Sequence, residues 1–252
     1  MKTAKNAGRS GAARSARAAA REPGVSQRNL AYESFRQQIL SARIRPGQFV
    51  SQRELMRLLD MPLGAVREMI PRLEAARLIV TVPKRGLQIA PVDLKLIRNA
   101  FQVRAMIERE AVLNFVRHAS DEELTRIEQQ HRDILARATS GKPDSRLDDD
   151  AQAADWGLHD TMIDAMGNEI LSEIYRVNSL HVRLIRLDAD QVRPMRVVPA
   201  MQEHLKFIDA LRARDERRAV DAVAEHIENS RERVITAMLG GGAPAREARS
   251  SS

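Results

Sequence analysis

Residues 46–86 have the sequence PGQFVSQRELMRLLDMPLGAVREMIPRLEAARLIVTVPKRG, and this stretch decides the fold of the N-terminal part of the chain. Ser51 and Glu54 fit the capping-box pattern, in which each of the two side chains binds a free backbone N–H at the start of a helix. A short helix is therefore predicted from there to the turn before Pro62. A second helix is predicted to begin near Leu63.

The end of the same stretch has the pattern of a β-hairpin. Two runs rich in β-branched residues, 78–82 and 87–90, are joined by four residues that end in Gly86, and such runs predict two antiparallel strands. Upstream, apolar residues recur at helical spacing between 30 and 40. Three helices followed by a hairpin predict a winged helix-turn-helix.

The rest of the chain shows only helical patterns. Hydrophobic residues make up 43% of the sequence and aromatic residues 3%, so Leu, Ile, Val, Ala and Met must fill the core. Ser120 begins a second capping box, and Gly167 suits the position just after a helix end. We predict a mainly α protein whose C-terminal part is an all-helical bundle, with helices at about 93–117, 120–138, 147–166, 168–187, 195–213 and 215–239.

Composition divides the chain into four segments. Residues 1–28 and 240–252 have few large apolar side chains and cannot offset the entropy of ordering, so we predict disordered tails there. Residues 29–92 are the predicted winged-helix DNA-binding domain. Residues 93–239 are the predicted all-helical domain that binds an effector and a metal ion.

Charge is distributed unevenly between these segments. The net charge is +7 for the whole chain, +6 for residues 1–28, +5 for residues 29–92 and −5 for residues 93–240. A basic module beside an acidic one indicates a nucleic-acid partner for the basic module. The alternative is that the basic tail is only solvated.

Cysteines, membrane spans and secretory signals are all absent from the sequence. The lack of cysteine excludes disulfides and thiolate metal sites. No uninterrupted run of about 18 apolar residues could form a transmembrane helix, and the basic N-terminus lacks the apolar segment of a secretory signal. We therefore expect a cytoplasmic protein that does not enter a membrane.

Cations on the predicted helix-turn-helix and hairpin are candidates for DNA contact. The second helix of such a motif enters the major groove, which favours Arg67 for contact with base edges. Arg53 on the preceding helix and Lys84 and Arg85 on the wing are the other cations well placed for DNA. For any one arginine the alternative is a solvent-facing side chain, but the four together favour DNA contact.

This region resembles the winged-helix domain of the GntR family of bacterial regulators. The matching pieces are Pro46-Gly47, Arg53-Glu54-Leu55, Val66-Arg67-Glu68, Arg72-Leu73-Glu74 and the wing Arg85-Gly86. The resemblance implies a dimeric regulator that binds double-stranded DNA at a two-fold symmetric operator.

The start of the recognition helix departs from that family's pattern. The family usually carries Ser or Thr followed by Arg, whereas this chain has Pro62-Leu63-Gly64-Ala65. Leu63 cannot make the bidentate bond to guanine that an arginine makes. With Leu63 and Gly64 at the interface, we expect an operator unlike the family's usual one, read through thymine methyl groups or DNA shape.

Four residues of the C-terminal part are candidate metal ligands. Asp155 and His159 are four residues apart and share one helix face, while His204 and His226 lie on the last two predicted helices. One Asp and three His that converge in a bundle form an N₃O site for a divalent cation. Taken singly, a D-x₃-H pair is usually polar surface, and a lone His on an apolar helix is usually a core residue.

The local contexts of these residues resemble the FCD domain, which defines the FadR-type branch of the GntR family. The resemblance covers residues 93–239 and rests on Asp155-Trp-Gly-Leu-His159, Met166-Gly167-Asn168, Glu203-His204 and His226-Ile227. It implies that Asp155, His159, His204 and His226 bind Zn, Ni or Mn.

Arg104 is the candidate clamp for an effector carboxylate. The family pattern has an Arg and a Glu in this part of the domain, and an Arg fork can bind a carboxylate bidentately. The alternative is an i,i+4 pair with Glu108 on a helix face. The remaining histidines are expected to be structural or exposed: His118, His131 and His181.

Three functions fit these patterns. The first is a ligand-responsive regulator, a homodimer that represses a catabolic operon and senses a small carboxylate beside its metal ion. The second is a metal-dependent enzyme acting on a small organic acid. The third is a constitutive DNA-binding protein with a structural metal ion. The upstream winged helix and the lack of a motif for a general base favour a regulator over an enzyme.

Overall fold

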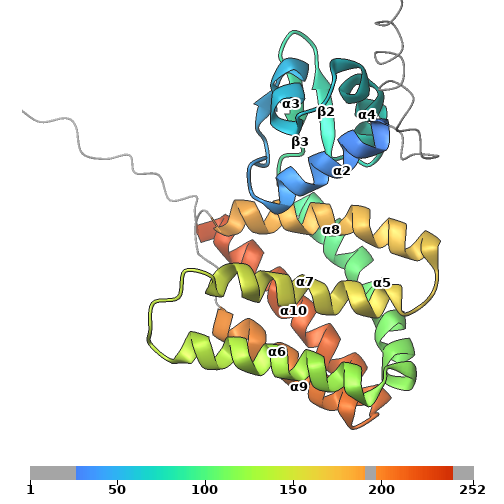
Figure 1. The fold of residues 1–252 in the computed structure, drawn as a ribbon, viewed down its shortest axis with the longest axis vertical. Coiled ribbons are helices and arrows are strands. Elements are labelled where there is room, and N and C mark those ends of the chain that lie inside the picture. Colours follow the sequence, from blue (N-terminus) through green and yellow to red (C-terminus); the bar gives the residue numbers. More distant parts are fainter. Residues whose placement is uncertain (1–26, 191–196, 241–252) are drawn as a thin grey trace, which may run out of the picture.

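The structure is a computed structural model, and it describes residues 27–190 and 197–240. A small N-terminal domain stands on a larger helical bundle (Figure 1). The N-terminal elements are α2 (Gln27–Leu40), β1 (Phe49–Val50), α3 (Gln52–Leu59), α4 (Leu63–Ala75), β2 (Ile79–Val82) and β3 (Gly86–Ile89). The bundle consists of α5 (Leu94–His118), α6 (Asp121–Thr139), α7 (Leu147–Asp164), α8 (Glu169–Asp190), α9 (Val197–Arg212) and α10 (Glu216–Gly240).

The predicted capping box starts α3. The Glu54 N–H donates to Ser51 Oγ over 3.2 Å, and the Ser51 N–H donates to Glu54 Oε2 over 2.7 Å. Asp60, in the left-handed region at φ 51°, ends the helix. The three N-terminal helices bury a common apolar core that includes Phe35 and Leu55. The predicted winged helix is therefore confirmed.

The sheet contains one strand more than the sequence predicted. Strand β3 lies between β1 and β2, and both pairings are antiparallel. The extra strand β1 has two residues, too few to show an alternating pattern. Gly86 has φ 97°, and a Cβ atom there would lie 3.2 Å from the Val50 carbonyl oxygen. The positive φ and the close approach of β1 together favour glycine at this position.

The six predicted bundle helices are confirmed, with small shifts at their ends. Helix α8 continues to Asp190, beyond the predicted end at Leu187. Helix α2 begins at Gln27 and α10 ends at Gly240, so the two segments predicted to be disordered each overlap a helix at their edge. Residues 1–26, 191–196 and 241–252 lie outside the described residues. Within the described part of the chain, no helix has the length and apolar character that spanning a membrane requires.

Helix α8 packs against both parts of the molecule (Figure 1). Leu180 and Leu184 on this helix are buried in the core of the winged-helix domain. Glu173 near its start pairs with Arg72 of α4 over 2.8 Å. Its His181 Nε2–H donates to the carbonyl of Ala76, directly after α4, over 2.9 Å. The winged helix thus rests on a helix that belongs to the bundle.

Candidate metal centre in the helical bundle

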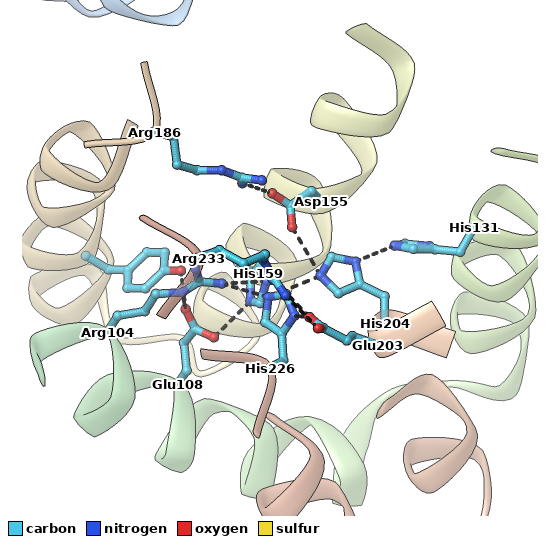
Figure 2. Close-up of polar contacts among 11 residues, drawn as sticks. Arg104, Glu108, His131, Asp155, His159, Arg186, Glu203, His204, His226 and Arg233 are labelled. Atoms are coloured by element: carbon cyan, nitrogen blue, oxygen red, sulfur yellow. Dashed lines mark hydrogen bonds and ion pairs between the residues drawn. The ribbon is translucent and has the colours of Figure 1, made fainter. Parts of the chain in front are cut away.

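Four buried side chains converge in the middle of the bundle (Figure 2). Asp155 and His159 come from α7, His204 from α9 and His226 from α10. One donor atom from each lies within 4.8 Å of the donor atoms of the other three. The structure therefore brings together the four residues that the sequence singled out, and their role as metal ligands remains a prediction.

Two carboxylates face the outer sides of two of these histidines. His159 Nδ1 lies 2.8 Å from Glu108 Oε2, and neither atom has another hydrogen-bonding partner in the structure. His226 Nδ1 lies 2.9 Å from Glu203 Oε2. A carboxylate oxygen accepts from an Nδ1–H, so each ring carries its hydrogen on Nδ1 and its lone pair on Nε2, the atom that points into the centre.

Arg104 also points into the centre. Its side chain is 2% exposed, its Nε pairs with Glu108 Oε1 over 2.5 Å, and its Nη2 lies 2.7 Å from His159 Nε2 and 3.4 Å from His226 Nε2. A guanidinium only donates, so these contacts agree with lone pairs on both Nε2 atoms. The i,i+4 pair of Arg104 with Glu108 is thus present in the structure, and the Arg104 side chain also faces the proposed metal ligands.

Charges around the centre are paired. Burial disfavours ionised Glu108 and Asp155, but the nearby Arg104 and Arg186 respectively hold the pKa of each carboxyl below its usual value. Arg186 of α8 donates to Asp155 Oδ2. Burial also opposes ionisation of Glu203, but bonds from His226 and Arg233 lower its pKa to about 2.

Burial favours the neutral form of three imidazoles in the centre, those of His131, His204 and His226. Burial and the neighbouring His204 lower the pKa of His131 to about 4 and that of His226 to about 3. Burial likewise lowers the pKa of His204. These rings are therefore neutral near pH 7, as metal binding requires.

The donor set fits a divalent transition-metal ion. Three neutral nitrogen donors and one carboxylate oxygen form an N₃O set, which suits Zn, Ni or Mn. His204 Nε2 lies 3.1 Å from Asp155 Oδ1 and 3.4 Å from His226 Nε2. Ligands at about 2.0–2.2 Å from one ion lie within about 4.4 Å of one another, so a separation of up to 4.8 Å requires only small adjustments. The structure thus has a His/Asp cluster that could hold a metal ion.

Several residues of the centre were missed or set aside at the level of sequence. Glu108 was considered only as a partner of Arg104, and His131 only as a structural or exposed residue. Glu203 was named only as the residue before His204 in the family pattern, with no role of its own. No local pattern points to Arg186, which reaches Asp155 from 31 residues away, or to Tyr175, which donates to Glu108 Oε1 over 2.7 Å.

The predicted DNA-contacting residues lie on the winged-helix domain, away from this centre. Arg53 on α3 and Arg67 on α4 are exposed, and Arg67 Nε donates to Gln52 Oε1 over 3.0 Å. Leu63, the first residue of α4, is half-buried and Gly64 is exposed.

The wing residues are exposed as well. Lys84 has φ 63° at the tip of the β2–β3 hairpin, and the Arg85 guanidinium stacks on the ring of Phe49 at 3.9 Å. By contrast, Arg72 of α4 stacks on Tyr32 at 3.7 Å and pairs with α8. It is thus directed toward the bundle and away from the wing.

Two protein-family models match the chain. The model described as "Bacterial regulatory proteins, gntR family" matches residues 27–89, and the FCD domain model matches residues 99–229. The first range is the winged-helix domain, and the second contains all four residues of the candidate metal centre.

Similar proteins agree with these matches. HTH-type transcriptional regulator BphR of Paraburkholderia xenovorans (strain LB400) is 27% identical over 201 residues, which are 79% of this chain and 81% of that protein. The solved structure of E. coli McbR/YncC is 15% identical, with a TM-score of 0.72 over 84% of this chain and 99% of the other. The Zn²⁺-bound FCD domain of TM0439 is 24% identical, with a TM-score of 0.50 over 60% of this chain and 99% of the other.

These two structures share the fold with this chain. The matched families and the curated relatives are transcriptional regulators and not enzymes. The comparisons therefore speak against the interpretation of the centre as a catalytic site.

Proposed function

The chain belongs to the gntR family of bacterial regulatory proteins and is a DNA-binding transcriptional regulator with an FCD domain, and we propose that a small carboxylate bound at its metal centre controls its binding to DNA. The single observation that carries the proposal is the convergence of an N₃O donor set and a buried arginine at one point of the bundle.

We propose that a divalent ion, Zn, Ni or Mn, is held by Asp155, His159, His204 and His226. The comparable FCD domain of TM0439 is a Zn²⁺-bound one, which supports a divalent ion at this position. A bound ion supplies positive charge and free coordination positions to an anionic ligand.

Arg104 is the proposed clamp for the carboxylate of the effector. Its Nε already bonds to Glu108, while its Nη2 lies within 2.7 Å of His159 Nε2. A carboxylate beside the proposed ligands could therefore accept from the guanidinium edge that faces the centre. Because Glu108 balances the charge of Arg104, the effector does not have to neutralise an otherwise unpaired buried cation.

Helix α8 is the proposed link between the centre and the DNA-binding domain. On one side its Tyr175 and Arg186 bond to Glu108 and Asp155, two residues of the centre. On the other side its Glu173 and His181 contact α4 and the turn that follows it. A shift of α8 on effector binding would therefore move the recognition helix.

The proposed DNA contacts lie on the exposed face of the winged helix. Arg67 contacts base edges, the other cations contact phosphates, Leu63 contacts thymine methyl groups, and the two glycines allow close approach. The proposed set is Arg53, Leu63, Gly64, Arg67, Lys84, Arg85 and Gly86. We further propose that a homodimer binds a two-fold symmetric operator and represses a catabolic operon, from which the effector releases it.

The experiment combines operator selection with a panel of sugar acids, hydroxy acids and amino acids. The selected operator is bound in a gel-shift assay with each acid, using protein loaded with Zn²⁺ or Mn²⁺ or treated with a chelator. The proposal expects at least one acid to change operator affinity only in the metal-loaded protein. If the chain binds the operator equally well with every acid and with the chelator, it is a constitutive DNA-binding protein and the proposal fails.

Two features of the chain sharpen this experiment. The single tryptophan, Trp156, is buried next to Asp155 with the Arg183 guanidinium 4.0 Å above its ring, so its fluorescence reports binding of an acid near the centre. The variant Arg104→Lys keeps a cation beside Glu108 but loses the fork. It should bind the acid about 10–150-fold more weakly, because one charge-assisted hydrogen bond contributes about 1.5–3 kcal/mol.

A further inference from the structure

We propose that His131 is a positioning residue, which holds His204 in the tautomer whose Nε2 lone pair faces the centre. The inference rests on the proposed function in one respect, since it takes His204 to be a metal ligand. It concerns helix α6, which contributes none of the four donors.

His131 sits between a backbone carbonyl and His204 (Figure 2). Its ring is 1% exposed. Its Nδ1 lies 2.8 Å from the carbonyl oxygen of Ile127, and its Nε2 lies 3.1 Å from His204 Nδ1. Both nitrogens of His131 are therefore engaged in directed contacts.

These two contacts fix the position of each proton. The Ile127 carbonyl can only accept, so His131 Nδ1 carries the hydrogen. A neutral imidazole has one N–H, which leaves a lone pair on His131 Nε2. That lone pair accepts from His204 Nδ1, and the lone pair of His204 then lies on Nε2, toward the centre.

His204 needs such a partner more than the other two histidines do. Its Nε2 lies 3.1 Å from Asp155 Oδ1, so the carboxylate favours a proton on the very atom that must bind the ion. The outer nitrogens of His159 and His226 face carboxylates instead, and these hold the proton on the outer side. For His204, the neutral ring of His131 holds the proton on the outer nitrogen, Nδ1.

A neutral acceptor also fits the charges around the centre. Each of the three nearby carboxylates is matched by one arginine, in the pairs Glu108–Arg104, Asp155–Arg186 and Glu203–Arg233. A fourth carboxylate at position 131 would be a buried charge for which none of these arginines remains. Histidine supplies the acceptor without adding a charge.

The first test compares metal affinity between variants of the full-length protein by chelator competition with Zn²⁺ and Mn²⁺. His131→Leu removes the acceptor and should weaken binding by about 10–100-fold, the usual effect of losing an outer partner of a ligand. His131→Gln offers its amide oxygen to His204 Nδ1, so its metal affinity should be close to that of the wild type. His118→Leu is the matched control, because His118 Nδ1 makes the same contact to a carbonyl four residues back, at 2.9 Å, but is exposed.

Two outcomes of this test overturn the proposal. One is wild-type affinity in His131→Leu. The other is equal weakening in His131→Leu and His131→Gln when both variants unfold at the same temperature as the wild type, because the residue would then act through packing alone.

The second test uses the wild-type protein and therefore does not depend on whether a variant folds. Long-range ¹H–¹⁵N correlation spectra of the metal-free wild-type protein, labelled at histidine nitrogens, report which nitrogen of His204 carries the proton. A proton on Nδ1 supports the proposal, and a proton on Nε2 overturns it. If the wild type binds none of Zn²⁺, Mn²⁺ and Ni²⁺, the proposed metal site fails, while the tautomer of His204 still decides the role of His131.

Discussion

The two functional regions of this chain are built in opposite ways. The proposed DNA contacts come from a stretch between residues 53 and 86, are mostly exposed, and have few neighbours, such as Gln52 beside Arg67 and Phe49 beneath Arg85. The four proposed metal ligands come from α7, α9 and α10 and are buried, and the side chains that contact them come from α5, α6 and α8 as well. The polar atoms of this metal centre are bonded to one another across the bundle.

This difference sets the size and the independence of mutational effects. An exposed cation is solvated in the free protein, so its removal affects only the complex with DNA. A buried charge depends on its partner, and removal of that partner leaves an uncompensated group in a medium of low dielectric. The effects of substitutions in the centre should therefore be large and coupled, whereas the effects of substitutions on the DNA-binding face should be smaller and nearly additive.

The largest effect is expected for Glu108→Gln. The substitution keeps the volume but removes the charge that balances buried Arg104, which should lower the free energy of unfolding by about 3–5 kcal/mol. Urea denaturation measures the change. Glu216→Gln is the control, because Glu216 pairs with Arg117 at the surface and its loss should leave the midpoint unchanged. Equal midpoints for the two variants would contradict the contrast between buried and exposed pairs.

The next largest effect is expected for His204→Ala. Loss of one of four proposed ligands should weaken metal binding by more than the roughly 10–100-fold that removal of an outer partner causes. Elemental analysis after dialysis against a weak chelator measures the metal content. His118→Ala, on the exposed end of α5, should retain the wild-type content. Full occupancy in His204→Ala would remove this residue from the ligand set.

Local sequence patterns predicted the fold well because they reflect local physics. The capping box at Ser51, the apolar spacing of the helices and the β-branched runs of the wing each act over a few residues. Strand β1 escaped prediction because a two-residue strand exists only through its pairing with β3. The continuation of α8 to Asp190 was also not predicted, because Leu187 was the last clear member of the apolar pattern of this helix.

The centre was predictable only in part, and for the same reason. Asp155 and His159 share a helix face, so their proximity follows from spacing, whereas His204 and His226 were associated with them through the family resemblance. The contact of His131 with His204 spans 73 residues, and nothing in the flanking sequence distinguishes it. Outer partners of this kind depend on how helices pack, which a single sequence does not show.

On the DNA-binding face, Arg67→Ala tests whether an exposed residue acts alone. If Arg67 contacts a base edge, the substitution should weaken operator binding by about 1–3 kcal/mol and relax specificity at one base position. Titration by gel shift against the operator and single-base variants measures both. Arg126→Ala on α6, an exposed arginine of the bundle, should have no effect. Unchanged binding by the Arg67 variant would exclude it from the interface, and a change in metal content would contradict the independence of the two regions.

The smallest effect on stability, and the one that joins the two regions, is expected for Glu173→Ala. The Arg72 and Glu173 side chains are 38% and 55% exposed, and such a surface pair contributes only about 0–1 kcal/mol. The urea midpoint and the metal affinity of this variant should therefore stay close to those of the wild type.

The acid-induced change in operator affinity should shrink in Glu173→Ala, because α8 would then hold α4 through one polar contact fewer. Gel-shift titrations with and without the acid measure this coupling, with Glu169→Ala, an exposed residue at the start of the same helix, as the control. If the acid acts on Glu173→Ala and on the wild type to the same degree, the ion pair does not transmit the signal. The route would then have to run through the His181 contact to Ala76 or the apolar contacts of Leu180 and Leu184.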